Sequence, residues 1–520
     1  MGSELHEKTQ YDHDNPPFQE EHTVEEEDTA AQNASDAMFA KAPWQYKIIA
    51  LVTALLLPLG SHFSQSALGA MKKSIKSELG IDNTRYGVLS SSVSIINTVF
   101  PIAGGLFIDM FGSVWGTLAV NVLIIIGSLL TAIAGKYTSF PLMIVGRVIF
   151  GIGSGLIVTM QESLLSKWFR TNNLAIAIGL QLSISRLATF LGTLVSNPIA
   201  KATGDWVWPF WLSFIICAFS IAMNVVYALI VKNLRGRITA SQSEIDKLKA
   251  KKTFHWRSVF KFPALYWLII LLEFILAAVW SSFQTISTEF VTMHFHTTNV
   301  LAGYQASASQ TVPIVATPLL GIVMDLFGLR IIILLISTIF LILSAVLLGW
   351  TYVSAVVGMV FYSISLAFGP IAMITSIGMI LPSDYIGTGL GIYKSSNNIG
   401  TTILDIIVGV VQDKTANQAY TGVMIVFLCL ASVGFVLVVV LWLAQRIWYE
   451  NLLEASRKKR EAQMKEVNAK ELSLAQRGKD AYDETRIPMR GIICASIFVA
   501  AFIVAWVLFF VYAAGGGVSA

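Results

Sequence analysis

The sequence predicts an all-α membrane protein built from two six-helix bundles, with one extra transmembrane helix at the C-terminal end. Three observations predict this fold class: an apolar composition, a series of helix-length apolar segments, and a short signature that occurs twice. Of the 520 residues, 55% are hydrophobic and 13% are charged, and the mean hydropathy is +0.67. A soluble fold of this composition would expose large apolar surfaces, so we place the chain in a lipid bilayer.

The spanning segments are predicted from their length and apolarity. A helix that crosses a bilayer needs roughly 20 mostly apolar residues. The first twelve segments of this kind form the two bundles and the thirteenth is the extra helix. They begin near Trp44, Thr84, Ser113, Phe140, Asn173, Trp208, Pro263, Asn299, Leu329, Tyr352, Ile386, Thr421 and Met489.

The repeated signature indicates a duplication. Residues 105–112 and 321–328 both have the pattern G-x-x-x-D-x-x-G, and each copy lies between two apolar helix-length segments. Transporters built from parallel repeats hold their substrate between the two halves, near the middle of the bilayer. The corresponding residues are Gly105, Asp109 and Gly112 in the first copy and Gly321, Asp325 and Gly328 in the second.

Charged stretches divide the chain into bundles, linkers and tails. The predicted parts are a disordered acidic cytosolic tail (1–42), an N-terminal six-helix bundle (43–232), a basic cytosolic linker (233–262), a C-terminal six-helix bundle (263–445), a charged cytosolic segment (446–488) and the thirteenth transmembrane helix (489–514).

The basic residues set the orientation in the membrane. Between Lys232 and Lys261 there are nine Lys or Arg against two acids, and between Arg446 and Arg490 eleven against eight. By the positive-inside rule both stretches face the cytosol. A shorter basic segment then faces outward, against the rule, and the two longer stretches decide the orientation. Its basic residues are Lys72, Lys73, Lys76 and Arg85.

Signatures of enzymes and cofactors are missing from the sequence. It contains no Walker A motif, no nucleotide-binding pattern and no His and Cys cluster with metal-ligand spacing. We therefore predict no enzyme activity, no cofactor, no metal and no nucleic-acid partner. The predicted partners are a small-molecule substrate and the lipid bilayer.

The duplicated signature resembles the one that the major facilitator superfamily carries between its helices 2 and 3 and between its helices 8 and 9. In that family the aspartate faces the start of a helix, whose dipole attracts it, and holds the cytosolic gate shut. The resemblance implies a gating role for Asp109 and Asp325 and for the glycines of the signature, whereas a simple helix cap is the alternative. The family's basic residues after the second glycine are missing at Ser113 and Val114, and only Arg330 remains in the second copy.

The fourth predicted helix also carries a motif that resembles one of this superfamily. Arg147 begins the pattern R-x-x-x-G-x-G-x-G. Glycines at this spacing let helices pack backbone to backbone, and an arginine inside the membrane must be paired. Arg147 therefore joins the predicted gating residues.

A narrower resemblance, between Gly60 and Asp413, is to the lysosomal dipeptide transporter group of the superfamily. Its most specific element is Gly-Leu-Gln-Leu-Ser-Ile-Ser-Arg at residues 179–186. The resemblance implies that Arg186 binds a substrate carboxylate, that the protein lies in a lysosomal or vacuolar membrane, and that an accessory membrane subunit shields it. The plasma membrane is the alternative location. The acidic residue that the group carries in its fourth helix is Gly155 here.

Polar side chains recur every three or four residues on the fifth and eleventh predicted helices, which are equivalent members of the two repeats. Arg186 and Lys394 would each present a cation to a central cavity, and Asn398 lies on the same helix face as Lys394. A cation at this depth costs about 2.5–3.5 kcal/mol, so an anionic partner is expected. His62 and Gln284 add polar groups from the first and seventh helices, although either could be a structural residue.

Three acidic residues balance the basic residues of the predicted helices. They could form buried ion pairs that fix the register of the helices. Alternatively, the cations bind a substrate carboxylate while a desolvated acid takes up a proton in each cycle. The three acids are Glu162, Glu273 and Asp405.

The functional prediction is a secondary active or facilitative transporter that moves a small organic solute by alternating access, in symport where a proton is taken up. The expected solute is a dipeptide, an amino acid or another carboxylate. The alternative is a membrane sensor or scaffold that transports nothing and binds a partner through its charged segment and thirteenth helix.

Overall fold

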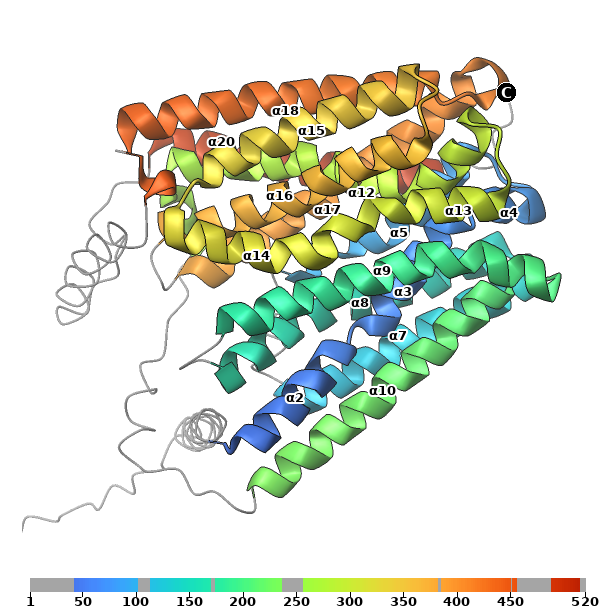
Figure 1. The fold of residues 1–520 in the computed structure, drawn as a ribbon, viewed down its shortest axis with the longest axis horizontal. Helices are drawn as coiled ribbons and strands as arrows, with labels where there is room; N and C mark the ends of the chain where they lie inside the picture. The colour runs from blue at the N-terminus through green and yellow to red at the C-terminus, as the bar shows by residue number, and fades with distance from the viewer. Residues whose placement is uncertain are drawn as a thin grey trace, which may run out of the picture.

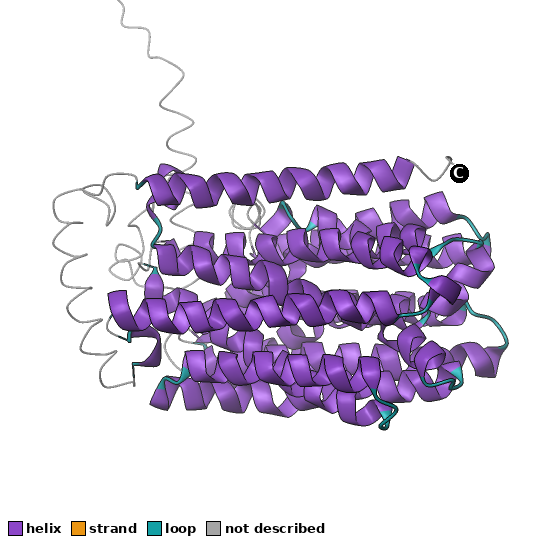
Figure 2. Cartoon of the chain, turned by 90° about the horizontal axis from the view of Figure 1, so that it is seen from above, coloured by secondary structure: helices purple, strands orange, loops and turns teal. Residues whose placement is uncertain are grey.

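A computed structural model describes residues 42–101, 113–169, 174–235, 256–381, 385–449, 451–455 and 488–514. The elements of these ranges are α-helices and short 3-10 helices, and the long helices lie side by side (Figures 1 and 2). We call one end of the bundle the linker end, because the helices on either side of the predicted linker 233–262 end and begin there. There α2 begins at Trp44, α10 ends at Arg235 and α12 begins at Ala264. At the opposite end, the far end, α17 ends at Lys414.

The first span of the N-terminal half is broken at Pro58 into α2 and α3. Proline has no backbone N–H, so it interrupts the hydrogen bonds of a helix. The helices of this half are α2 (Trp44–Leu56), α3 (Leu59–Ala70), α4 (Lys72–Leu79), α5 (Asn83–Ile96), α7 (Ser113–Lys136), α8 (Phe140–Phe169), α9 (Leu174–Thr203) and α10 (Trp208–Arg235).

The C-terminal half follows the short 3-10 helix η1 (Trp256–Lys261) and ends at η5 (Leu452–Glu454). Its helices are α12 (Ala264–His294), α13 (Asn299–Ser307), η2 (Ala308–Gln310), α14 (Thr311–Phe327), α15 (Arg330–Trp350), α16 (Ala355–Ile380), α17 (Ile386–Lys414), η4 (Ala416–Gln418) and α18 (Thr421–Trp448). The extra helix is α20 (Met489–Ala514).

The predicted helix starts agree with the structure. The largest offset is at the tenth predicted helix, which was expected near Tyr352 and begins at Ala355. Eleven helices of the described ranges are long and apolar enough to cross a membrane. The helices α5 and α17, which the sequence also predicts as spans, fall outside that criterion. Helix α5 is too short, with 14 residues. Helix α17 has 29 residues and is too polar, with charged residues such as Lys394 and Asp405 along its length.

The two halves repeat the same packing pattern. The first helix of each half packs against the fifth, as α3 does on α9 and α12 on α17. The third packs against the fourth, as α7 does on α8 and α15 on α16, and against the sixth, as α7 does on α10 and α15 on α18. The duplication read from the sequence is therefore a duplication of the fold.

The halves meet along α5 and α17, and along α9 with α13 and α14. Glycines let α5 and α17 approach closely. A Cβ atom added to Gly87 would lie 2.5 Å from the carbonyl oxygen of Asp405, and one added to Gly409 would lie 2.5 Å from that of Asn83. The polar faces of both helices are thus pressed against protein, which explains how such polar helices lie inside the bundle.

The extra helix α20 packs against α5 of one half and against α17 and α12 of the other. The indole Nε1 of Trp506 donates a hydrogen bond to Thr98 Oγ1 at 3.1 Å. Ala505 and Phe509 are buried in this contact, whereas Ile497, Val507 and Phe510 on other faces are exposed. The helix therefore lies over the boundary between the two halves.

Candidate functional site

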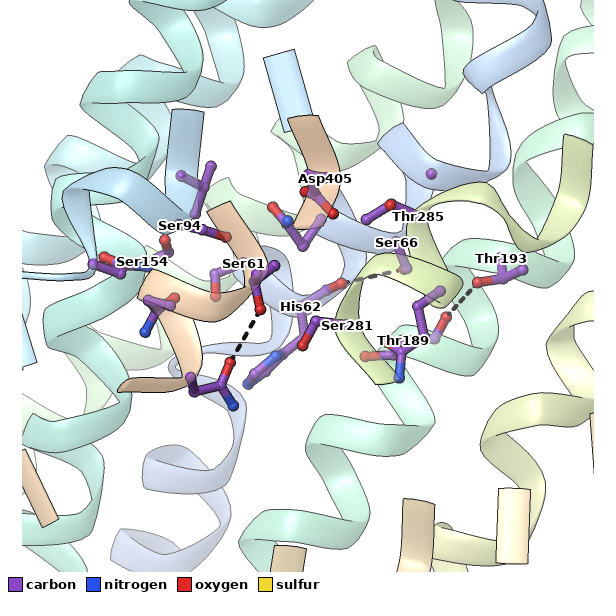
Figure 3. A pocket seen from close by; sticks show the side chains of 18 of the residues that line it. Ser61, His62, Ser66, Ser94, Ser154, Thr189, Thr193, Ser281, Thr285 and Asp405 are labelled. Carbon is purple, nitrogen blue, oxygen red and sulfur yellow. Dashed lines mark hydrogen bonds between the residues drawn. The ribbon is translucent and has the colours of Figure 1, made fainter. Parts of the chain in front are cut away.

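A cavity of about 260 Å³ lies between the two halves. Its lining comes from α3, α5, α8 and α9 on one side and from α12, η2 and α17 on the other. Most of the lining side chains are polar, and Figure 3 shows His62, Thr189, Ser281 and Asp405 around it. A polar cavity between repeats is the arrangement that a solute site requires.

The cavity brings together five of the side chains singled out in the sequence. They come from four helices: His62 on α3, Arg186 on α9, Gln284 on α12, and Asn398 and Asp405 on α17. Residues more than 300 positions apart in the chain therefore line the same cavity. The other predicted site residues that the structure describes are not part of this lining.

Arg186 is the cation of this lining. Within the described residues no carboxylate forms an ion pair with it. Most other polar side chains of the lining are hydroxyls and amides, among them Thr189 on the same helix and Gln284 on α12. A guanidinium presents a rigid set of donors that fits a carboxylate bidentately.

Lys394, the other predicted cation, is not part of the lining. Its Nζ lies 2.7 Å from Glu162 Oε2, and the two side chains are 26% and 34% exposed. The pair joins α17 of the C-terminal half to α8 of the N-terminal half. Lys394 as a substrate ligand and Glu162 as a balancing acid both stay predictions, and in this conformation each is the partner of the other.

Glu273 lies behind the lining, on α12. It is buried and accepts a hydrogen bond at 2.9 Å from Asn397 Nδ2, while Asn397 itself lines the cavity. Its second carboxylate oxygen has no hydrogen-bond partner among the described residues. Glu273 is thus one residue removed from the cavity.

Arg147 is fully buried behind the wall on the side of α8. It donates a hydrogen bond to the side-chain oxygen of Gln65, which lines the cavity, and its guanidinium lies 4.6 Å from the centre of the Phe150 ring. The ring and the amide supply part of the pairing expected for an arginine inside the membrane, while Nε and Nη1 have no hydrogen-bond partner among the described residues. Arg147 fixes α8 against α3.

The structure describes the second copy of the duplicated signature but not the first. Residues 105–112, with Gly105, Asp109 and Gly112, lie outside the described residues. In the second copy Gly321 lies within α14 and Gly328 follows its end with φ +82°, a conformation that glycine adopts without strain. The side chain of Asp325 also lies outside the description. The gating roles of both copies stay predictions.

The far end of the bundle is closed by a network that the sequence did not reveal. Lys72 Nζ lies 2.8 Å from Glu289 Oε2, and Lys76 Nζ lies 3.1 Å from Glu289 Oε1. Lys72 also donates to Gln412 Oε1 at 2.9 Å and Tyr420 OH at 3.0 Å. We call these five residues the far-end network. It joins α4 of one half to α12, α17 and the start of α18 of the other.

A second contact of the far end involves Asp413 at the end of α17. Its Oδ2 accepts from the backbone N and the hydroxyl of Thr84 at 2.8 and 2.6 Å, and its Oδ1 accepts from Asn83 Nδ2 at 2.8 Å. These groups begin α5, so the carboxylate also faces the start of a helix. The two contacts together hold the halves against each other at this end.

The far-end network also explains the basic segment that contradicted the positive-inside rule. Lys72 is 1% exposed and Lys76 13% exposed, and both are paired with one carboxylate. Two of the four basic residues of this segment therefore pair with one acid inside the protein rather than facing the membrane surface. The spacing of the two lysines, one helical turn apart, was the signal that could have marked them as a pair on one face.

The sequence profile of the Major Facilitator Superfamily matches this chain over residues 54–296 and over residues 269–519. The matches cover most of the chain, and the chain belongs to this superfamily. It is a multi-pass membrane transporter and not an enzyme.

Among characterised relatives, Lysosomal dipeptide transporter MFSD1 of Bos taurus is 24% identical over 441 residues, which cover 84% of this chain and 93% of that protein. The Homo sapiens protein is 24% identical over 438 residues, covering 83% and 93%. The Hexuronate transporter of Bacillus subtilis (strain 168) is 25% identical over 171 residues, or 33% of this chain. The resemblance noted in the motifs therefore extends over most of the chain.

Solved structures agree on the fold. The xylose transporter XylE from E. coli, in a partially occluded inward open conformation, superimposes with a TM-score of 0.62 at 15% identity and covers 78% of this chain and 98% of that one. The peptide transporter POT in complex with sulfate gives 0.60 at 14% identity, covering 78% and 96%. At such low identity these structures confirm the fold alone.

Proposed function

We propose that this protein moves small organic carboxylates, with dipeptides and amino acids as the first candidates, across the membrane by alternating access. The observation that supports the proposal is Arg186, a cation without an ionic partner among the described residues, in a polar cavity between the two halves. The similarity to Lysosomal dipeptide transporter MFSD1 favours dipeptides among the carboxylates.

The closed far end supports the transport cycle that we propose. With the far-end network formed, the two halves are held together on that side of the cavity. Alternating access then requires these contacts to break while contacts at the linker end form. The signature residues around Asp109 and Asp325 are our candidates for the linker-end contacts, and Lys394 with Glu162 joins them there.

The driving force and the location are part of the proposal. Proton-coupled relatives of this fold, such as the D-xylose-proton symporter with a TM-score of 0.61, make symport a reasonable mechanism. Glu273, buried one residue behind the cavity, is our candidate for the proton site.

We propose a lysosomal or vacuolar membrane from the similarity to the lysosomal relatives. Co-localisation of a tagged full-length chain with an organelle marker checks this, and plasma-membrane staining would contradict it.

The decisive experiment is uptake by the purified full-length chain in liposomes. Radiolabelled alanyl-alanine is offered with and without an inward proton gradient, to wild type and to Arg186→Ala. We expect saturable uptake by wild type and a loss of at least a hundredfold in the variant, because a buried carboxylate without its cation is strongly disfavoured.

The matched control is Lys201→Ala, which removes an exposed cation from the far end of the same helix. It should transport like wild type. Undiminished uptake by Arg186→Ala would remove the carboxylate role. If wild type transports no tested solute under either condition, the sensor or scaffold function is favoured instead. The accessory subunit stays a prediction, which co-purification from native membranes checks.

A further inference from the structure

Asp405 is the acidic residue of the cavity. It lies nine residues before the end of α17 at Lys414 and is 4% exposed. Among the described lining residues Asp405 carries the one carboxylate, and Arg186 carries the one guanidinium or ammonium group. His62 is the third titratable side chain of the lining. The other polar groups are hydroxyls and amides, so the lining offers one site of each charge.

The carboxylate of Asp405 has no partner within the described residues. Both of its oxygens are buried without a hydrogen bond. Ser90 and Ser282 lie near it, but their hydroxyls also lack hydrogen-bond geometry. A buried charge that is left unpaired is costly, and its cost is recovered when a cation or a proton binds.

The neighbouring basic side chains are already engaged. Lys72, which shares a small second cavity with Asp405, binds Glu289, Gln412 and Tyr420. Arg147 donates to Gln65, and Lys394 pairs with Glu162. Among the described residues that line the cavity, Arg186 is the one Lys or Arg, so a cation that reaches Asp405 through the cavity comes from Arg186 or from the solute. Arg186 comes from α9 in the other half, and no described carboxylate forms an ion pair with it.

We infer that Asp405 binds the ammonium group of a zwitterionic substrate whose carboxylate is bound by Arg186, which makes Asp405 the residue that selects for a free amine. This inference rests on the proposed function. An ammonium donates charge-assisted hydrogen bonds to a carboxylate, and these are about twice as strong as neutral ones. A solute held at both ends contacts α9 and α17 at once, so binding ties the two halves together.

The side of α8 offers no competing acidic site. A Cβ atom on Gly155 would overlap the amide of Asn97, so the space above this glycine is filled by a neutral side chain from α5. Asn97 and Ser154 complete this part of the lining. The negative charge of the described lining is therefore concentrated at Asp405.

Three probes separate the two charged ends of the solute. Alanyl-alanine carries both charges, N-acetyl-alanyl-alanine lacks the ammonium, and alanyl-alaninamide lacks the carboxylate. Uptake into liposomes and equilibrium binding to the purified full-length chain are measured for wild type, Asp405→Asn and Asp405→Glu. Thermal stability of each variant reports whether it folds.

We expect wild type to prefer alanyl-alanine over its N-acetyl analogue at least tenfold. Asp405→Asn should lose this preference, through weaker binding of alanyl-alanine and unchanged or tighter binding of the N-acetyl analogue. Asp405→Glu keeps the charge and should keep a preference. Glu78→Gln, which neutralises an exposed carboxylate outside the lining, should leave the ratio of the two probes unchanged.

Other outcomes overturn the inference in distinguishable ways. If wild type handles the N-acetyl analogue as well as alanyl-alanine, Asp405 does not select the amine while the carboxylate function of Arg186 stands. If Asp405→Asn keeps the preference but loses its response to a proton gradient, Asp405 is a protonation site. If wild type neither binds nor transports any of the three probes, the inference and the proposed function both fail.

Discussion

Within the described residues, ion pairs join the two halves of this transporter at two places, and the pairs differ in burial rather than in length. At the far end Lys72 and Glu289 are 2.8 Å apart and 1% and 3% exposed. Nearer the linker end Lys394 and Glu162 are 2.7 Å apart, yet 26% and 34% exposed. Water screens the second pair, whereas the first lies in a medium of low dielectric constant. Burial therefore makes the far end the stronger closure.

The difference in burial between these pairs suggests which end of the bundle opens more easily in the transport cycle. Breaking a buried pair leaves two charges without solvent, while a half-exposed pair can exchange its partner for water at little cost. The described conformation is accordingly one in which the far end is shut firmly and the pair nearer the linker end is easily exchanged.

The largest effect is expected when the buried pair loses its acid. Glu289→Gln leaves Lys72 and Lys76 facing each other without a counter-charge, and removal of one partner from a buried pair costs about 3–5 kcal/mol. We expect the far end to open. Spin labels at Lys73 and Asn417, both exposed and in different halves, measure the opening as a longer distance distribution.

The control for this variant is Glu78→Gln, which neutralises an exposed acid on the same short helix as Lys72. Its distance distribution should match that of wild type. A Glu289→Gln distribution equal to the wild-type one would mean that packing, and not the ion pair, closes the far end.

A smaller effect is expected from the helix contact beside the far-end network. Gly87→Ala places a methyl group 2.5 Å from the carbonyl oxygen of Asp405, and overpacking of this kind costs about 1–3 kcal/mol. We expect α5 and α17 to separate slightly and thermal stability to fall. Gly387→Ala, on α17 itself, serves as a contrast, because nothing lies within 4 Å of its added Cβ. Equal stability of Gly87→Ala and wild type would contradict the close contact.

The smallest effect is expected at the half-exposed pair. Lys394→Gln or Glu162→Gln removes an interaction of about 0.5 kcal/mol, which corresponds to a change of roughly twofold in an equilibrium. The charge-swapped double variant, Lys394→Glu with Glu162→Lys, should restore wild-type uptake. A hundredfold loss in Lys394→Gln that the swap does not restore would show that Lys394 binds substrate directly.

The positions of Arg186 and Lys394 along equivalent helices explain why Arg186 lines the cavity and Lys394 does not. Arg186 lies 12 residues after the start of α9 at Leu174, and Lys394 lies 8 residues after the start of α17 at Ile386. The difference of four residues is one helical turn, or about 6 Å along the axis. Periodicity placed both cations on inward faces, but it did not fix their depth. Asn398 is the residue of α17 at the depth of Arg186, and it lines the cavity.

The sequence predicted the helices and much of the cavity lining because both follow from local pattern. Apolar length marks a span, and a three- and four-residue spacing of polar groups marks the face that turns away from lipid. Arg186, Asn398 and Asp405 were found in this way. Glu289 was not, because α12 also carries Glu273, Gln284 and several hydroxyl residues, and their spacing does not show which acid meets a partner in the other half.

By itself the sequence determined the membrane fold, the duplication and the inward helix faces, since these depend on composition and on spacing along a few turns. Only the tertiary structure decided which charges pair and which stay free. The partners Glu162 and Lys394 are 232 residues apart in the chain, and Lys72 and Gln412 are 340 apart. Local pattern carries no information about such distances, because the packing of one half against the other sets them.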